Sequence, residues 1–242
     1  MAEDYFSGSR AERYDEQAGA RLFAPEVIGP IVDVLAKLAG DGAALELGIG
    51  TGRIALPLRQ RGVRVSGIDL SPDMVAQLRK KPGSESIDVA IGDFSTTTVD
   101  GRFTVAYVVA NTILNITTQD AQVACFQNVA AHLEPGGCFA IDVVMPDLQR
   151  LPYGETFRPF HVGSNHIGID EYDVANQGLI SHHYYPGEDE VASIPFRYVW
   201  PAELDLMAQL AGMRLRERWS GWRREPFTSD SMRLVGFWEK TT

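Results

Sequence analysis

Three glycines spaced two residues apart mark the stretch of the chain best suited to hold a ligand. Gly48, Gly50 and Gly52 follow a short apolar run and open a helical pattern. Glycine lets a ligand approach the backbone closely, and free N–H groups at a helix start offer hydrogen-bond donors. Dinucleotide sites usually have the spacing GxGxxG, whereas this loop reads GxGxG. Glu46 precedes the loop, where its carboxylate would repel a pyrophosphate but favour a ligand that carries ammonium and sulfonium groups.

Acidic residues end the next two apolar runs. Asp69 comes about twenty residues after the loop, at a distance suited to accept hydrogen bonds from both ribose hydroxyls of a nucleoside. Taken alone, Asp69 could equally help to start the helix that follows Ser71. Asp93 could accept a hydrogen bond from the exocyclic amine of adenine while Phe94 packs against the ring; the alternative is a capped loop with a core phenylalanine. Together with the glycine loop, these residues predict a nucleoside site.

Parallel strands are expected to position these residues. Apolar β-favouring runs alternate with amphipathic helical patterns through the first 145 or so residues, which is typical of βαβ units. We expect strands at residues 43–47, 63–69, 87–91, 104–109 and 138–144, and helices at 25–38, 52–60, 72–80 and 120–132. Ser71 is the expected N-cap of the helix at 72–80, with Pro72 at its first position. The pattern predicts an α/β fold.

Beyond residue 146 the chain becomes aromatic and β-rich. Strands are expected at 166–174, 179–185 and 193–199, joined by turn sequences, and a helix at 201–210 precedes strands at 215–222 and 232–239. This order predicts three parts. Residues 1–145 form a ligand-binding core with an N-terminal helical cap, residues 146–200 form an antiparallel β insertion that acts as a substrate lid, and residues 201–242 complete the core sheet.

Four segments in order resemble the motifs of class I S-adenosylmethionine-dependent methyltransferases of the small-molecule type. They read ELGIGTG at 46–52, DLSPDM at 69–74, GDF at 92–94 and LEPGG at 133–137. The resemblance covers roughly residues 43–144. It implies a Rossmann-like, doubly wound, mostly parallel seven-stranded sheet whose final strand inserts antiparallel. It also implies S-adenosylmethionine as cofactor and S-adenosylhomocysteine as product.

The resemblance also implies a contact for each motif. The glycine loop, with Glu46 before it, would contact the methionine part of the cofactor. Asp69 would bind the ribose, Leu70 and Met74 would lie on the faces of the adenine, and Asp93 would bind its edge.

Two further residues are expected at the cofactor by the same resemblance. Asn111, just past the fourth strand, would line the sulfonium side, the alternative being that it caps the loop. Tyr14 resembles the residue of the N-terminal helix that closes over the cofactor in many small-molecule members, although a tyrosine on an amphipathic helix can also serve packing. No NPPY or DPPY follows the fourth strand, where residues 110–113 read ANTI, so methylation of a flipped base loses support.

Composition narrows the partners and the compartment. The formal net charge is −10, so the overall field repels a polyanion and no nucleic-acid partner is expected. The only cysteines, Cys125 and Cys138, form no CxxC pair, which favours a reducing compartment, taken as the cytoplasm. The N-terminus lacks an apolar core of signal-peptide length, and the most apolar stretch, residues 103–116, is interrupted by Asn111 and Asn115, so no membrane contact is expected. A homodimer is compatible with the sequence, which leaves the oligomeric state open.

The methyl acceptor decides whether a general base is needed. A hydroxyl acceptor benefits from a base, whereas an amine needs only to be neutral. His182 and His183, in the β insertion, are the candidate catalytic bases; strand alternation sends them to opposite faces, and surface or packing roles are the alternative for each. Neither a second histidine nor an acidic cluster has the spacing of metal ligands, so no metal is expected.

The sequence therefore predicts an S-adenosylmethionine-dependent methyltransferase that acts on nitrogen or oxygen of a small-molecule acceptor. One alternative is a catalytically silent S-adenosylmethionine-binding or regulatory module, because methyl transfer leaves no obligatory catalytic residue to look for. A nucleotide-dependent oxidoreductase is less favoured because of the loop spacing and Glu46.

Overall fold

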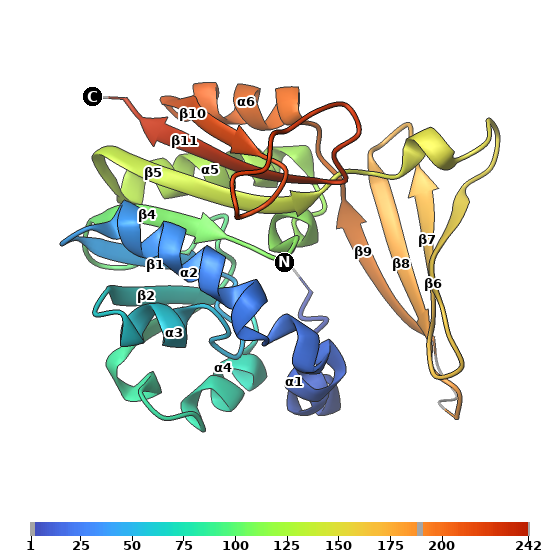
Figure 1. Ribbon diagram of the computed structural model, residues 1–242, viewed down its shortest axis with the longest axis horizontal. Coiled ribbons are helices and arrows are strands. Elements are labelled where there is room, and N and C mark those ends of the chain that lie inside the picture. The colour runs from blue at the N-terminus through green and yellow to red at the C-terminus, as the bar shows by residue number, and fades with distance from the viewer. Residues whose placement is uncertain (1–2, 188–190, 242) are drawn as a thin grey trace.

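Seven strands form the main sheet of the computed structural model, which describes residues 3–187 and 191–241 (Figure 1). The order across this sheet is β10-β11-β5-β4-β1-β2-β3. The strands are β1 (Ala43–Leu47), β2 (Arg64–Asp69), β3 (Asp88–Ile91), β4 (Phe103–Val108), β5 (Leu133–Val144), β10 (Met213–Trp219) and β11 (Arg233–Lys240). Neighbours from β3 to β5 run parallel, and β11 is antiparallel to both β5 and β10. The predicted fold class, with its antiparallel final strand, is confirmed.

The chain crosses the sheet between β1 and β4. From β1 it builds outward through β2 and β3, and then returns to place β4 on the other side of β1. In open α/β sheets, ligands bind outside the carboxyl ends of the strands at such a reversal of strand order. The topology therefore places the candidate site beyond the ends of β1 and its neighbours.

Helices cover both faces of the main sheet. The helices α2 (Pro25–Ala39), α3 (Ala55–Gln60) and α4 (Pro72–Arg79) pack on one face, and α5 (Gln119–His132) and α6 (Pro201–Leu210) pack on the other. Alternation along β1 explains the split. Ala44 lies in a first hydrophobic cluster, which includes residues of α2, α3 and α4, whereas Leu45 and Leu47 lie in a second cluster, which includes residues of α5 and α6. The inner strands β1 and β4 are buried on both sides, as their continuous apolar runs predict, whereas the edge strands β3 and β10 are partly exposed.

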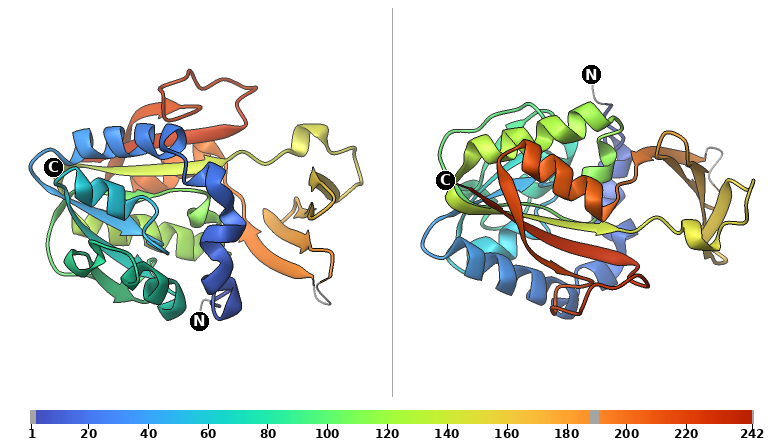
Figure 2. Two further views of the ribbon diagram at one scale, coloured as in Figure 1. Left: turned by 60° about the horizontal axis from the view of Figure 1, so that its bottom comes forward. Right: turned by 90° about the horizontal axis from the view of Figure 1, so that it is seen from above.

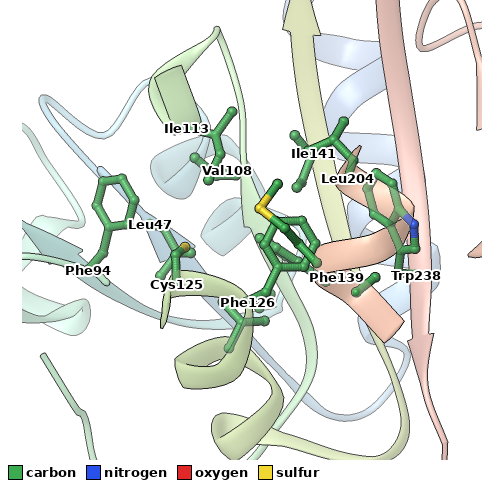
Figure 3. Close-up of a cluster of buried hydrophobic side chains, with 14 of the residues drawn as sticks. Leu47, Phe94, Val108, Ile113, Cys125, Phe126, Phe139, Ile141, Leu204 and Trp238 are labelled. Atoms are coloured by element: carbon green, nitrogen blue, oxygen red, sulfur yellow. The ribbon is translucent and has the colours of Figure 1, made fainter. Parts of the chain in front are cut away.

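Aromatic rings join three elements in the second cluster (Figure 3). Phe126 of α5 meets Phe139 of β5 edge to face, with ring centroids 5.1 Å apart, and meets Trp238 of β11 at 6.0 Å. Such pairs add about 0.5–1.5 kcal/mol each beyond the burial of their area. They fasten the antiparallel strand to the parallel part of the sheet.

A second, antiparallel sheet stands at one end of the core (Figures 1 and 2). Its strands are β6 (Phe157–Val162), β7 (Ile167–Asp173), β8 (Gly178–Tyr184) and β9 (Ala192–Arg197). Three of them were predicted, whereas β6 was not. Pro159 interrupts its β pattern, and a proline is tolerated there because β6 is an edge strand whose residues are largely exposed.

The N-terminal helix α1 (Ser9–Leu22) lies on the side of the core that faces the second sheet (Figures 1 and 2). Gly19 breaks its helical geometry with φ 74° and ψ 157°. Three single turns of 3-10 helix, η1 (Ser84–Ser86), η2 (Thr112–Asn115) and η3 (Leu148–Arg150), complete the described elements. Within the described residues, no helix combines the length and the apolar character needed to cross a membrane.

Most local predictions match the observed elements. The helix expected at 201–210 is α6, and Ser71 caps α4 by accepting a hydrogen bond from the backbone nitrogen of Met74, with Pro72 at the first helical position. The strand expected at 138–144 begins earlier, because the LEPGG segment at 133–137 is already part of β5.

Candidate functional site

A cleft of about 660 Å³ opens beyond the carboxyl ends of β1, β2, β3 and β4. The N-terminal segment, η2, the start of α5 and strand β9 close its other sides. The described residues that line it include four carboxylates, from Glu3, Asp4, Asp69 and Asp93, and no lysine, arginine or histidine. The cleft is therefore suited to a cationic ligand and unsuited to a phosphate.

The glycine loop forms the floor of one end of this cleft. Gly48 and Gly50 line it, whereas Gly52 does not. All three have positive φ, at 69°, 54° and 79°. A Cβ atom on Gly48 would lie 2.5 Å from Cγ2 of Thr112, and one on Gly52 would lie 2.4 Å from Cδ1 of Leu78. Gly48 is thus needed for close packing against η2, and Gly52 for packing against α4.

Asp69, the last residue of β2, faces the glycine loop. Its Oδ2 accepts a hydrogen bond from the backbone nitrogen of Gly50 at 2.6 Å, and its Oδ1 accepts one from Ser71 at 2.9 Å. Each oxygen keeps a second lone pair, so the carboxylate can also accept two ligand hydroxyls. Burial raises the pKa of Asp69, and the two backbone hydrogen bonds act against that rise. Leu70 and Met74 line the cleft beside it.

Asp93 and Phe94 lie at the end of β3 and also line the cleft. The Oδ1 atom of Asp93 accepts hydrogen bonds from the backbone nitrogen and the hydroxyl of Ser95, at 2.8 and 2.7 Å, so this residue caps its own loop. Phe94 is 8% exposed and belongs to the hydrophobic core. Phe94 is thus a core residue whose ring also forms part of the wall of the cleft, and its packing against adenine stays a prediction.

The turn after β4 has a strained backbone. Ala110 and Asn111 both line the cleft with left-handed φ values of 58° and 69°. Such values in residues other than glycine cost about 1–3 kcal/mol each and persist only where the surroundings impose them. Here β5 does so, because Oδ1 of Asn111 accepts a hydrogen bond from the nitrogen of Val144 at 2.8 Å and the nitrogen of Asn111 donates to the carbonyl of Asp142. Asn111 therefore caps the loop and faces the cleft.

The N-terminal segment closes the cleft above the glycine loop. Tyr14 lines the cleft and meets Phe6 edge to face at 6.0 Å. Asp15 holds α1 in place by accepting a hydrogen bond from the Thr51 hydroxyl at 2.6 Å and by pairing with Lys81. Burial raises the pKa of Tyr14, so its phenol stays neutral at ordinary pH.

Glu46 lies behind the lining of the cleft and is only 3% exposed. Its carboxyl accepts hydrogen bonds from the Tyr107 hydroxyl, at 2.9 Å, and from the backbone nitrogen of Ala55 at the start of α3. Burial raises the pKa of Glu46 to about 8, although the hydrogen bond from Tyr107 and the charge of Arg53 both lower it. Glu46 is therefore not among the residues that meet the cleft, and in the ligand-free protein its carboxyl is uncharged below about pH 8.

The structure does not bring His182 or His183 into the lining of the cleft. The His182 ring is within hydrogen-bond distance of Ser193 and Glu171. On the other face, Nδ1 of His183 lies 3.0 Å from Nε2 of His166, and burial lowers the pKa of His183 to about 4. His183 is therefore neutral at ordinary pH, but it is not among the residues that meet the cleft.

Several lining residues were not predicted from the sequence. They belong to η2, the segment after it, the start of α5 and strand β9: Thr112, Asn115, Ile116, Thr117, Thr118, Ala121, Pro195 and Phe196. No motif marks them, because β9 is far from η2 in sequence and only the fold brings the two together. Throughout residues 3–187 and 191–241, no group of three or more His, Cys, Asp or Glu side chains is arranged to hold a metal ion.

The cleft fits the sulfonium nucleoside that the motifs imply. Its glycine floor leaves no room for added side chains, and the carboxylate of Asp69 keeps lone pairs for two hydroxyls. Its four carboxylates suit a ligand that carries both a sulfonium and an ammonium group, whereas a dinucleotide would bring phosphates into the same field.

Comparisons with known proteins agree with this chemistry. A family model described as a methyltransferase domain matches residues 44–137. The cypemycin N-terminal methyltransferase of a Streptomyces species is 28% identical over 201 residues, which cover 81% of this chain and 82% of that protein. The CcbJ methyltransferase of Streptomyces caelestis has 31% identity and a TM-score of 0.86, covering 99% of this chain and 100% of that chain.

A more distant structure shares the fold. CalS10, an amino pentose methyltransferase from Micromonospora echinaspora whose structure contains bound S-adenosylmethionine, has a TM-score of 0.69 at 17% identity, with complete coverage of both chains. The family match, the similarity to CcbJ over the whole chain and the ordered motifs around the cleft all agree. The chain therefore belongs to the class I S-adenosylmethionine-dependent methyltransferases.

Proposed function

We propose that this methyltransferase transfers the methyl group to the nitrogen of a small-molecule amine. The observation that carries the proposal is the charge of the cleft, whose described lining holds four carboxylates and no basic side chain. Such a field attracts ammonium compounds and repels acids. The names of relatives agree, since the cypemycin enzyme is an N-terminal methyltransferase and CalS10 acts on an amino pentose.

The chain's own residues would hold the cofactor at the glycine end of the cleft. In this proposal Gly48 and Gly50 lie against its methionine part, Asp69 binds the ribose hydroxyls, and Asp93 binds the adenine. When bound, S-adenosylmethionine supplies an electrophilic methyl group on a sulfonium and leaves as S-adenosylhomocysteine. Tyr14 and the rest of α1 would exclude water from this end.

The other end of the cleft would hold the acceptor. The residues from η2, α5 and β9 that line it offer hydroxyl, amide and apolar groups, but no histidine, lysine or carboxylate. A hydroxyl acceptor would need a base at this point, whereas an amine that has lost its proton carries its own lone pair. The work left to the protein is to orient the amine and to keep water out.

The second sheet would serve as the lid over this acceptor end. Residues 146–200 contain all four of its strands, and β9 brings Pro195 and Phe196 to the cleft. In this proposal residues 1–145 bind the cofactor, residues 146–200 cover the acceptor and residues 201–242 complete the core.

The test is a methylation screen with matched acceptors. Purified protein is incubated with S-adenosylmethionine and pairs of amines and alcohols that share one carbon skeleton, and methylated products and S-adenosylhomocysteine are measured by mass spectrometry. The proposal predicts product from amines and none from their alcohol partners. Methylation of the alcohols in preference would contradict it, and cofactor binding without turnover of any pair would favour a silent binding module.

A further inference from the structure

One polar side chain at the acceptor end of the cleft has no partner. Asn115, the last residue of η2, lines the cleft, and its Oδ1 atom is buried without a hydrogen-bond donor in the described structure. A buried acceptor left without a donor costs about 1–3 kcal/mol. Asn128, in the same protein, shows the ordinary situation, because its amide donates to the carbonyls of Phe94 and Thr97.

The backbone around Asn115 is held on both sides. The side-chain amide of Gln122, from α5, donates to the carbonyls of Ile113 and Ile116, which flank Asn115 in sequence. Gln122 is itself fixed, since it donates to the carbonyl of Arg197 and accepts a hydrogen bond from the Arg197 side chain at 2.5 Å. The position of Asn115 is therefore set before any ligand arrives, which is the arrangement expected of a recognition residue.

The side-chain amide of Asn115 can turn, and the turn moves the unpartnered buried position from Oδ1 to the NH₂ group. Rotation of an asparagine carboxamide is roughly two-fold, and a half-turn exchanges its oxygen and its NH₂ group. The Oδ1 atom gives up no hydrogen bond to a described residue in this motion. The turn presents Oδ1 to a donor in the cleft, and Ile116 and Phe196 provide apolar surface beside it.

We propose that Asn115 recognises the acceptor, with its Oδ1 accepting a hydrogen bond from the N–H of an amine that is carried on an apolar body. The inference rests on the proposed function, because it names the acceptor contact within the same cleft. It adds a specificity-determining residue outside the cofactor motifs. Hydrogen bonding to the amine leaves the nitrogen lone pair free, so the contact orients the nucleophile without consuming it.

The first test needs no acceptor and uses thermal unfolding of the ligand-free protein. Asn115→Leu removes an unpartnered amide from a partly apolar site, so the Tm should stay the same or rise. The matched Asn128→Leu variant loses two hydrogen bonds and leaves two carbonyls without their donor, so its Tm should fall. A fall for Asn115→Leu equal to that for Asn128→Leu would show that Asn115 is structural and would overturn the proposal.

The second test measures ligand binding by the protein saturated with S-adenosylhomocysteine. Benzylamine and toluene serve as probes, because they differ only in the amine on the same apolar ring. Wild type should bind benzylamine more tightly than toluene. Asn115→Leu should weaken benzylamine binding by about tenfold, as expected for one hydrogen bond, and leave the affinity for S-adenosylhomocysteine unchanged.

Three results would overturn the proposal. They are equal binding of the two probes by wild type, benzylamine binding that is unchanged in Asn115→Leu, and loss of S-adenosylhomocysteine affinity in that variant, which would place the contact on the cofactor. Failure of the proposed function is seen elsewhere, as absence of amine methylation by the wild-type protein in the screen.

Discussion

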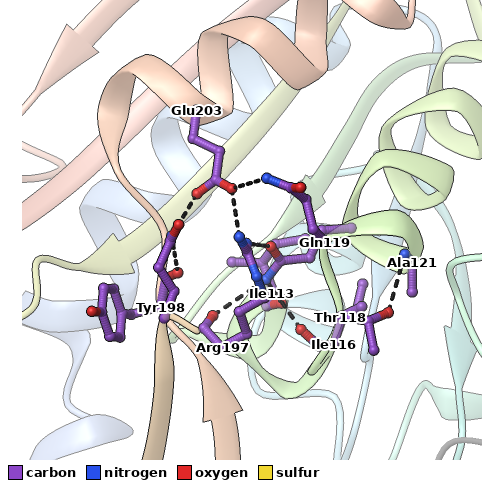
Figure 4. A network of polar contacts seen from close by, with 10 residues as sticks. Ile113, Ile116, Thr118, Gln119, Ala121, Arg197, Tyr198 and Glu203 are labelled. Atoms are coloured by element: carbon purple, nitrogen blue, oxygen red, sulfur yellow. Dashed lines mark hydrogen bonds and ion pairs between the residues drawn. The ribbon is translucent and has the colours of Figure 1, made fainter. Parts of the chain in front are cut away.

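Arg197, the last residue of β9, forms an ion pair with Glu203 in the first turn of α6, with a nitrogen-to-oxygen distance of 2.6 Å (Figure 4). Both side chains are nearly buried, at 7% and 12% exposure. Gln119 of α5 donates to the same carboxylate. Burial of Glu203 acts to raise its pKa, but hydrogen bonds from Arg197, Gln177 and Gln119 outweigh that effect and hold the pKa below its ordinary value. The pair joins the second sheet to the core.

Removal of Arg197 should therefore destabilise the protein strongly. Arg197→Ala removes the charged partner of the buried Glu203 carboxylate and the donor to the side-chain oxygen of Gln122, and breaking a buried pair in this way costs about 3–5 kcal/mol. Urea unfolding measures the change. Arg214→Ala is the matched control, because the Arg214–Glu239 pair has an arginine that is 71% exposed, and its loss should cost about 0–1 kcal/mol. Equal losses for the two variants would contradict the structural role of Arg197.

Glu46 should make the stability of the ligand-free protein fall as pH rises. The folded chain keeps the Glu46 proton up to about pH 8, whereas an exposed glutamate in the unfolded chain loses it near 4.5. Between these values the folded state binds more protons, so the free energy of unfolding decreases with pH and levels off above about 8.

The Glu46→Gln variant tests this expectation because it cannot ionise. Its pH dependence between 5 and 8, measured by urea unfolding, should be flatter than that of wild type by the contribution of one proton. Glu134→Gln, at an exposed position, should keep the wild-type slope. A Glu46→Gln profile that parallels wild type would show that Glu46 is already ionised in the folded protein.

Substitution of Gly48 should weaken cofactor binding. An alanine there would place Cβ 2.5 Å from Cγ2 of Thr112 at a φ of 69°, so the floor of the cleft must shift. We expect S-adenosylmethionine to bind at least about tenfold more weakly, measured by calorimetry. Gly62→Ala is the control, since Gly62 also has positive φ but no atom within 4 Å of the added Cβ. Backbone strain should lower the free energy of unfolding of Gly62→Ala by about 1–2 kcal/mol, and its binding of S-adenosylmethionine should be unchanged.

The cofactor end of the site could be predicted because its residues follow directly from local patterns. Gly48, Asp69 and Asp93 each come at the end of an apolar strand, and parallel strands bring their carboxyl ends together. Glu46 belongs to the same pattern but faces inward, because residues of β1 alternate between the two faces of a sheet that is covered on both sides. Sequence spacing alone does not distinguish a lining residue from one that supports it.

The acceptor end could not be predicted, because it depends on contacts between distant segments. Asn115 faces the cleft since Gln122 fixes the backbone on either side of it, and Gln122 is held by Arg197 at the end of β9, where the second sheet meets the core. His182 and His183 stood out in the sequence as titratable residues on an expected strand. Their partners are Glu171 in β7 and His166 in the turn between β6 and β7, and neither lines the cleft.

The placement of the cofactor at Asp69 is tested most directly by calorimetric titration. Wild-type protein and Asp69→Ala are each titrated with S-adenosylmethionine, S-adenosylhomocysteine and NADH. We expect the first two to bind wild type and NADH not to bind. Asp69→Ala should weaken binding by about ten- to a hundredfold through loss of charged hydrogen bonds worth about 1.5–3 kcal/mol. Asp69→Asn keeps an oxygen for one of the two backbone donors, so its affinity for S-adenosylmethionine should lie between those of wild type and Asp69→Ala. Tight binding of NADH, or unchanged affinity for S-adenosylmethionine in Asp69→Ala, would contradict the placement of the cofactor at the carboxyl end of β2.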